Sequence, residues 1–352
     1  MSRATAVPPD FAARLNDLYS DPAACAELAG LRYVDDAEPG IRRLRCGRGF
    51  RYLDVRGRAV NGQVRERLAA LAVPPAWKDV WLCVDDGGHL LATGVDDRGR
   101  KQYLYHERWR ETRESLNFAR LIPFSDALPI VRRNVSAQLR RRTLDRQRVL
   151  AAMVRIIDGT AMRIGNEVYA EENDSFGLST LSRRHVVIRG DSLRMTFPAK
   201  SGRKAELTLR DAAVARVVAA LLEQRSRRLF TVDGERIDSD AVNAALDTWA
   251  GARVTAKDFR TWHGTRVAFE TIETAKSIEA EQVALAAVDA TAEWLGNTRD
   301  VARSSYVHPQ LLTTVLDGTF DDLRPTRTPR SPAELSAAER RLRAFLVAVW
   351  SR

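Results

Sequence analysis

VWLCVDDGGHLLATGVDDRGRKQYLYH (residues 80–106) is the stretch that sets the fold class of the N-terminal part of this chain. Apolar and polar residues alternate in VWLCV, HLLATGV and KQYLYH, which is typical of β-strands with one buried face. Asp85-Asp86-Gly87-Gly88 separates the first two segments, residues 97–99 separate the last two, and such Asp/Gly clusters form tight turns. The stretch therefore predicts an antiparallel meander.

Upstream of the meander, the sequence predicts one more strand and a short helix. Residues 51–55 are another candidate strand, and residues 64–71 carry a helical pattern that stops before Pro74-Pro75. Residues 1–110 are therefore predicted to form a small, mostly antiparallel β domain.

Downstream, from about Glu107, the apolar residues take up a helical period. Val131, Val135 and Leu139 recur at four-residue spacing, and residues 211–222 and 278–295 are rich in Ala, Leu and Val. Residues 111–352 are predicted to form a larger, mainly α domain, so the chain as a whole is α+β.

Two further elements are expected in this second part. SLRMTFPA and AELTL alternate around KSGRK (residues 200–204) and predict a hairpin. Ser331-Pro332-Ala333-Glu334 resembles a capping box and predicts that the last helix starts there. That helix would be amphipathic, with its apolar face made by Leu335, Leu342, Phe345 and Val349.

The charge of the chain favours an anionic polymer as partner. The net charge is +10, and phosphates neutralised by cationic side chains release counterions, which strengthens binding. The cations are 50 arginines and only 6 lysines, however, and a coding bias towards arginine would produce such an excess. Residues 132–155 carry eight arginines and one acid, Asp145, and form either a solvated helix face or a surface along a phosphate backbone.

The cysteines and the apolar residues indicate the compartment. Cys25, Cys46 and Cys83 are odd in number and widely spaced, which suits neither a disulfide framework nor a zinc site. No apolar tract is long enough to cross a bilayer, and no apolar signal region follows the first arginine. We expect a cytoplasmic protein with ordinary thiols.

Four segments hold the residues that could carry chemistry: MRIGNEVYAEENDSFGLSTL (162–181), FPAKSGRK (197–204), KDFRTWHGTR (257–266) and EWLGNTRDVARSSYVHP (293–309). Each segment alone would be unremarkable. Together, in this order, Arg163, Lys200, Arg260, Asn297 and Tyr306 resemble the active site of the poxvirus-like type IB DNA topoisomerases. KQYLYH (101–106) also resembles that family's DNA-contacting strand, so the resemblance covers nearly the whole chain.

The resemblance implies a fold, a reaction and a partner. The second domain would be a catalytic domain of the topoisomerase IB/tyrosine recombinase type. The enzyme would relax supercoiled duplex DNA by cutting one strand through a 3′-phosphotyrosyl intermediate and religating it, with neither ATP nor a metal. We expect a monomer that closes as a clamp around the DNA and that needs no cofactor.

The residue types fit this reaction. A tyrosine with a pKa near 10 is barely ionised at neutral pH, so nearby cations are needed to make its attack feasible. Arg163 and Arg260 could clamp the phosphoryl oxygens, in the place that a metal ion fills in many nucleases. Tyr306 is then the nucleophile.

Lys200 is the candidate general acid. Four of the six lysines, Lys101, Lys200, Lys204 and Lys257, fall inside the motif segments of a chain that otherwise uses arginine. An amine can be tuned by neighbouring cations until it donates a proton, whereas a guanidinium stays charged. By the family resemblance, Lys200 and Arg163 together assist departure of the 5′ oxygen.

Asn297 and His263 match the catalytic pattern of the family less directly than the residues above. Asn297 stands where many relatives have a histidine that contacts a non-bridging oxygen, and an amide can donate the same hydrogen bond without titrating. For His263, a structural, hydrogen-bonded role is favoured over a catalytic one. Lys257 and Arg260 are three residues apart and share one face if this segment is helical.

The resemblance also names DNA contacts in both domains. Gln and Asn can read base edges, and tyrosines can pack on sugars or donate to phosphates. Asn166 and Tyr169 are expected on the helix that would carry Arg163. The full set of expected DNA-binding residues is Arg100, Lys101, Gln102, Tyr103, Tyr105, Asn166, Tyr169 and Lys257.

Two alternatives remain open from the sequence. A tyrosine site-specific recombinase shares the catalytic constellation, but KDFR lacks the histidine that recombinases usually place three residues before the second arginine. The β-rich first part is also unlike their helical core-binding domain. A non-catalytic architectural protein would bind DNA through the arginine excess and form no covalent adduct.

Overall fold

The computed structural model describes residues 11–165, 167, 170, 174–199, 202–275 and 279–351. One compact unit, here called the N-terminal unit, ends at Ala119, and the C-terminal unit begins at Arg120. α4 (Glu107–Ala119) runs through residue 110, where the sequence suggested a boundary. The predicted α+β class, with an antiparallel sheet followed by a larger helical region, is confirmed. None of the described helices combines the length and the apolarity needed to cross a membrane.

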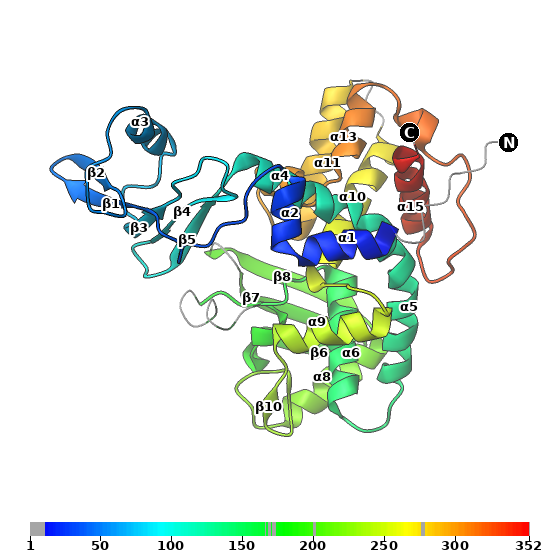
Figure 1. Cartoon of the computed structure of the whole chain (residues 1–352). Coiled ribbons are helices and arrows are strands. Elements are labelled where there is room, and N and C mark those ends of the chain that lie inside the picture. Colours follow the sequence, from blue (N-terminus) through cyan, green and yellow to red (C-terminus); the bar gives the residue numbers. More distant parts are fainter. Residues whose placement is uncertain are drawn as a thin grey trace. The chain divides into compact units, whose positions relative to one another are not determined.

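The N-terminal unit is built on an antiparallel sheet with strand order β2-β1-β3-β4-β5, coloured blue to cyan in Figure 1. The predicted meander is confirmed as β3 (Lys78–Leu82), β4 (Leu90–Val95) and β5 (Lys101–Tyr105), and the strand candidate before it as β2 (Gly49–Leu53). β1 (Ile41–Cys46) was not expected, because its three arginines hide the alternation of buried and exposed positions.

Two hydrophobic clusters form the core of this unit. α3 (Gly62–Ala70) buries Leu68 against Ile41, Tyr52 and Leu82 of the sheet. A second cluster gathers buried residues of α1 (Phe11–Ser20), α2 (Pro22–Leu28) and α4: Leu15, Cys25, Ala26, Trp109 and Leu116. All three cysteines are free thiols, as the sequence indicated.

The C-terminal unit is organised around α10 (Ala256–Thr274), whose Phe259, Trp262 and Phe269 are fully buried. α10 contacts α5 (Leu121–Leu139), α6 (Arg146–Thr160), α9 (Ser239–Ala250), α11 (Ala280–Leu295), α13 (Pro309–Leu316) and α15 (Ala337–Trp350). The expected apolar positions of α5, Val131, Val135 and Leu139, are buried.

A three-stranded antiparallel sheet flanks these helices, in the order β6-β7-β8 (Figure 1). The predicted hairpin is confirmed as β7 (Ser192–Pro198) and β8 (Lys204–Arg210), and β6 (Val186–Arg189) adds a third strand. β8 contacts α6, and β7 contacts α8 (Ala212–Glu223). Leu209, near the end of β8, lies against Gly159 at the C-terminal end of α6.

The predicted start of the last helix at Ser331 is wrong. α15 begins at Ala337, and Ser336 caps it by accepting from the Glu339 N–H at 3.2 Å. The Glu339 carboxylate is buried and accepts from Arg132 on α5 and from the Trp262 indole on α10. These tertiary contacts select the second Ser-x-x-Glu pattern over the first, where Glu334 pairs with exposed Arg133 instead.

Candidate active site

Tyr306 directly follows the short helix α12 (Arg299–Ser305). Its N–H donates to the Ala302 carbonyl at 3.0 Å, and its own carbonyl accepts from the Thr265 hydroxyl of α10, also at 3.0 Å. Its side chain is half-buried. The backbone of Tyr306 is thus fixed on both sides while the phenol remains accessible.

Arg260 lies next to the phenol of Tyr306. It is 5% exposed, and its guanidinium donates to the carbonyls of Ala161 and Leu295. The remaining nitrogen, Nε, is 3.5 Å from the Tyr306 hydroxyl, and the guanidinium carbon is 5.0 Å from the centre of the Tyr306 ring. Both backbone acceptors are neutral, so the charge of Arg260 acts mainly on the tyrosine.

Arg163 does not lie on a helix, contrary to the prediction. α6 ends at Thr160, because Ala161 takes a left-handed conformation (φ 46°) and closes the helix. The Arg163 carbonyl accepts from the Leu178 N–H at 2.9 Å, and the Ile164 carbonyl accepts from the Ser179 N–H at 2.7 Å. The Arg163 backbone is therefore held by a neighbouring loop, while its guanidinium donates to the Asn297 amide oxygen.

Asn297 connects the loop that carries Arg163 with the turn that carries Arg203. It follows Gly296, which ends α11, and its N–H donates to the Ala292 carbonyl at 2.8 Å. Its side-chain oxygen accepts from Arg163, and its backbone oxygen accepts from Arg203 at 3.3 Å. The side-chain nitrogen is buried and has no hydrogen-bond partner among the described residues.

The cations change the acidity of the tyrosine. Burial alone would raise the pKa of Tyr306, but the charges of Arg260, Arg163 and Lys257 outweigh it, and the pKa is lowered. The pKa of Arg163 is also lowered, by burial and by the charge of Arg260. The arrangement thus favours the phenolate and concentrates positive charge beside it.

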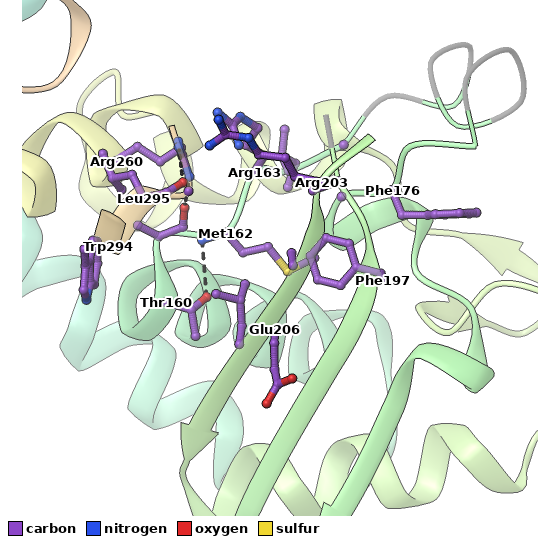
Figure 2. A pocket seen from close by; sticks show the side chains of 18 of the residues that line it. Thr160, Met162, Arg163, Phe176, Phe197, Arg203, Glu206, Arg260, Trp294 and Leu295 are labelled. Atoms are coloured by element: carbon purple, nitrogen blue, oxygen red, sulfur yellow. Dashed lines mark hydrogen bonds between the residues drawn. The ribbon is translucent and has the colours of Figure 1, made fainter. Parts of the chain in front are cut away.

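A cavity of about 810 Å³ opens beside these residues. Figure 2 shows its lining, with Phe197 and Arg203 from the β7–β8 hairpin and Arg260, Trp294 and Leu295 from the helices. Arg163 and Tyr306 line it as well. Lys257, one turn before Arg260 on α10, is exposed and also lines the cavity. The two residues therefore share one face of the helix, as predicted.

The remaining site residues predicted in this unit are Lys200, Asn166 and Tyr169, and they lie outside the described residues. Arg203 and Lys204 line the cavity, although neither was proposed as a site residue. The signal for them was present, because both belong to the KSGRK turn that the sequence marked as a hairpin tip.

The DNA-contacting residues predicted near residue 100 lie on β5 and the turn before it, in the N-terminal unit. The rings of Tyr103 and Tyr105 are stacked with centroids 6.0 Å apart, and Tyr103 is 48% exposed. Lys101 forms an ion pair with Asp36 at 2.6 Å. Arg100 and Gln102 both donate to Asp96, at 2.8 and 2.9 Å.

His263 has the structural environment that the sequence favoured. It is 5% exposed, and its Nε2 lies 3.2 Å from Asp158 Oδ1. Asp158 also accepts two hydrogen bonds from Arg132, each of 2.8 Å. Arg132 is thereby bonded to both Asp158 and Glu339, in a buried network that joins α5, α6, α10 and α15.

The arginine run at 132–155 is partly neutralised by acids. Arg132 is half-buried in the network just described, and four other members have acidic partners within 4 Å. These are Arg133 with Glu334, Arg141 with Asp145, Arg146 with Glu235 and Arg155 with Asp211. Arg132 therefore stabilises the fold of this unit, whereas the exposed pairs of Arg133, Arg141 and Arg146 contribute little.

Comparison with known proteins assigns the family. The catalytic core of eukaryotic DNA topoisomerase I matches residues 106–319, and the N-terminal domain of bacterial DNA topoisomerase IB matches residues 49–96. The chain is 30% identical over 285 residues to DNA topoisomerase 1B of Acanthamoeba polyphaga mimivirus, covering 76% of this chain and 85% of that protein.

More distant poxvirus proteins are also similar. DNA topoisomerase I of Monkeypox virus and DNA topoisomerase 1B of Vaccinia virus (strain Copenhagen) are each 21% identical over 241 residues, covering 66% of this chain and 75% of theirs. The alternative of a tyrosine recombinase finds no support in these similarities. The chain belongs to the type IB DNA topoisomerases, the family of isomerases that relax DNA by cleaving and resealing it.

Proposed function

We propose that Tyr306 is the nucleophile of this topoisomerase. Its phenol gives up its proton to solvent and the oxygen attacks a backbone phosphorus, so that the tyrosyl O–P bond forms and the bond from phosphorus to the 5′ oxygen breaks. The protein is left joined to the 3′ phosphate, and the other strand end is a free 5′ hydroxyl. The observation that carries this proposal is the position of Arg260, whose Nε lies 3.5 Å from the Tyr306 hydroxyl and which helps to lower its pKa.

Arg163, Arg260 and Asn297 are proposed to bind the non-bridging oxygens. The two guanidiniums present fixed positive charge where negative charge develops, and the Asn297 amide nitrogen is a buried donor without a partner among the described residues. Lys257 adds charge at the mouth of the cavity. This set supplies the electrostatic stabilisation that many nucleases take from a metal ion.

Lys200 is proposed to protonate the departing 5′ oxygen, assisted by Arg163. Proton balance requires such a donor, because an alkoxide is a poor leaving group. In religation the 5′ hydroxyl attacks the phosphotyrosine, its proton returns to the lysine, and Tyr306 leaves. The free energy of the phosphodiester is kept in the covalent intermediate, so we expect neither ATP nor a divalent metal to be required.

The partner is duplex DNA, contacted by both units. We propose that Arg100, Lys101, Gln102, Tyr103 and Tyr105 bind it from the N-terminal unit, and that Asn166, Tyr169 and Lys257 bind it from the C-terminal unit. A monomer would then act as a clamp around the DNA, in the cytoplasm and associated with the nucleoid. Binding through so many phosphate contacts should weaken steeply with salt.

The proposal is tested by trapping the covalent complex. Duplex DNA labelled on the cleaved strand is incubated with enzyme, denatured and separated. Wild-type enzyme should form an adduct on the 3′ end, in the presence of EDTA, and Tyr306→Phe should form none. Tyr52→Phe, a change in the core of the N-terminal unit, is the matched control and should form the adduct. An adduct from Tyr306→Phe, or one on the 5′ end, would refute the assignment.

A further inference from the structure

The N-terminal unit contains one turn twice. DVRGR (residues 54–58) and DDRGR (residues 96–100) share the pattern Asp-x-Arg-Gly-Arg. In both, the aspartate N–H donates to the carbonyl of the last arginine at 2.9 Å, and the glycine N–H donates back to the aspartate carbonyl. Gly57 and Gly99 have φ angles of 75° and 77°, a region in which side chains are strained.

The aspartate side chain closes both turns in the same way. Asp54 Oδ1 accepts from the backbone N–H of Arg56 and Arg58, and Oδ2 accepts from Arg58 Nε. In the second turn, Asp96 makes the equivalent bonds, to the Arg98 and Arg100 N–H groups through Oδ1 and to Arg100 Nε through Oδ2. One carboxylate is therefore sufficient to build such a turn.

Asp96 makes one bond that the turn does not need. Its Oδ2 also accepts from Gln102 Nε2, at 2.9 Å. The corresponding position after the first turn is Val60, whose side chain cannot form a hydrogen bond. The second turn thus has the same structure as the first, and in addition its aspartate binds Gln102 of β5.

This hydrogen bond determines which of the two possible orientations the Gln102 amide group takes. Arg100 lowers the pKa of Asp96 to about 2, so the carboxylate is ionised and can only accept. Turning the amide over would place its oxygen against a carboxylate oxygen, which is repulsive. The amide nitrogen is therefore held towards Asp96, while the amide oxygen and the second N–H remain for a ligand.

We infer that Asp96 is a positioning residue that fixes the orientation of the Gln102 amide for reading a base edge, and so contributes to the sequence preference of cleavage. The inference rests on the proposed contact of Gln102 with DNA. An amide with its oxygen and one N–H available matches an edge that offers a donor beside an acceptor, as adenine N6 and N7 do. A fixed amide discriminates against the reversed pattern, and a free one accommodates both.

The test is a double-mutant cycle on cleavage preference. Single-turnover cleavage rates are measured on duplexes in which each base pair around one mapped cleavage site is substituted in turn. The variants are Gln102→Ala, Asp96→Asn, the double variant, and Asp54→Asn as the matched control in the twin turn. In Asp96→Asn the new amide nitrogen faces Gln102 and favours the reversed orientation.

The expected result is specific to one pair of residues. Gln102→Ala and Asp96→Asn should each lose discrimination of about tenfold at the same base pair, and the double variant should lose no more. Asp54→Asn should keep the wild-type preference. A preference that changes in Gln102→Ala but not in Asp96→Asn would overturn the inference and leave the proposed DNA contact standing. A preference unchanged in Gln102→Ala would overturn both.

A second measurement does not depend on DNA or on how well a variant folds. In the NMR spectrum of the wild-type protein, the Gln102 side-chain amide protons should be shifted and protected from exchange by the bond to Asp96. Averaged, unprotected Gln102 signals in the wild-type enzyme would contradict a fixed amide.

Discussion

Gly264 of α10 lies so close to Tyr306 that a Cβ atom at Gly264 would stand 2.8 Å from the Tyr306 carbonyl oxygen and 2.9 Å from its Cβ. The neighbouring Thr265 hydroxyl donates to the same carbonyl. One turn earlier, the same helix presents Arg260 to the phenol. The absence of a side chain at Gly264 therefore sets the distance between Tyr306 and Arg260.

Gly264→Ala should slow cleavage more than it affects folding. The added methyl meets the carbonyl oxygen and the Cβ of Tyr306, and neither can rotate away, so Tyr306 must shift. A displacement of about 1 Å costs on the order of 10²-fold in rate. Gly159→Ala is the control, because the atoms nearest to its Cβ would belong to the flexible Leu209 side chain, away from Tyr306. Single-turnover cleavage and thermal melting of both variants decide the point. Equal loss of rate in the two would show that the effect is general.

Lys200→Ala should cut a normal phosphodiester very slowly but cut a 5′-bridging phosphorothiolate at close to the wild-type rate, because sulfur leaves without protonation. Lys204→Ala, which removes a cation that lines the cavity, should affect the two substrates equally. The measurement is the ratio of cleavage rates on the two substrates. If Lys200→Ala is equally slow on both, the lysine acts by its charge and not as an acid.

Asn297→Ala should lower the cleavage rate by about 10²- to 10³-fold, the usual cost of a lost transition-state donor. Asn297→Asp should be at least as slow, because it keeps the oxygen that accepts from Arg163 and replaces the free N–H donor with negative charge. Asn297→His should keep much of the activity and gain a pH dependence near the histidine pKa of about 6.5. Cleavage rates across neutral pH test all three, and a wild-type rate in Asn297→Ala would remove Asn297 from the site.

Glu339→Gln should destabilise the protein and reduce its loss of stability in acid. Burial opposes ionisation of Glu339, but Arg132 outweighs it and lowers the pKa to about 2, against about 4.3 in an unfolded chain. The depressed pKa stabilises the fold above about pH 4.3, and this contribution disappears as the pH falls towards 2. Breaking a buried pair costs about 3–5 kcal/mol at neutral pH.

The control for Glu339 is Glu334→Gln, which removes the partner of exposed Arg133. Exposed pairs contribute little, so its free energy of unfolding should stay close to that of wild type. Denaturant unfolding of both variants at pH 7 and at about pH 3 is the measurement. A Glu339→Gln protein as stable as Glu334→Gln would show that the buried network does not stabilise the fold.

The sequence predicts the regular parts of this fold well. The strands at 80–106 and the hairpin around residues 200–204 alternate clearly and end at turn residues, so local chemistry suffices to place them. β1 was missed because Arg42, Arg43 and Arg45 occupy positions where alternation would otherwise show. Arg43 is in fact buried, with its guanidinium bonded to the carbonyls of Val73, Pro74 and Trp77, and no local pattern reveals such a tertiary role.

The site could be predicted in its components but not in its geometry. Motif order placed Arg163, Arg260, Asn297 and Tyr306 together, and the structure gathers them around one cavity or in contact with its lining. The sequence put Arg163 on a helix, because nothing local signals that Ala161 would adopt a left-handed conformation. The contacts from Gly264 and Thr265 to Tyr306 join residues about 40 positions apart and follow only from packing.

The charges around Tyr306 also link folding to DNA binding. Arg163 and Arg260 donate to neutral oxygens, and within the described part of the chain neither has an ion-pair partner. Burial lowers the pKa of Arg163, and the charge of Arg260 lowers it further. The repulsion between the two guanidiniums in the free protein opposes folding. In the proposed complex a phosphate between them would relieve this repulsion, and a ligand that binds the native state raises its stability. We therefore expect the enzyme to be less stable free than bound to DNA, so that occupation of the site by a phosphodiester adds to the stability of the fold.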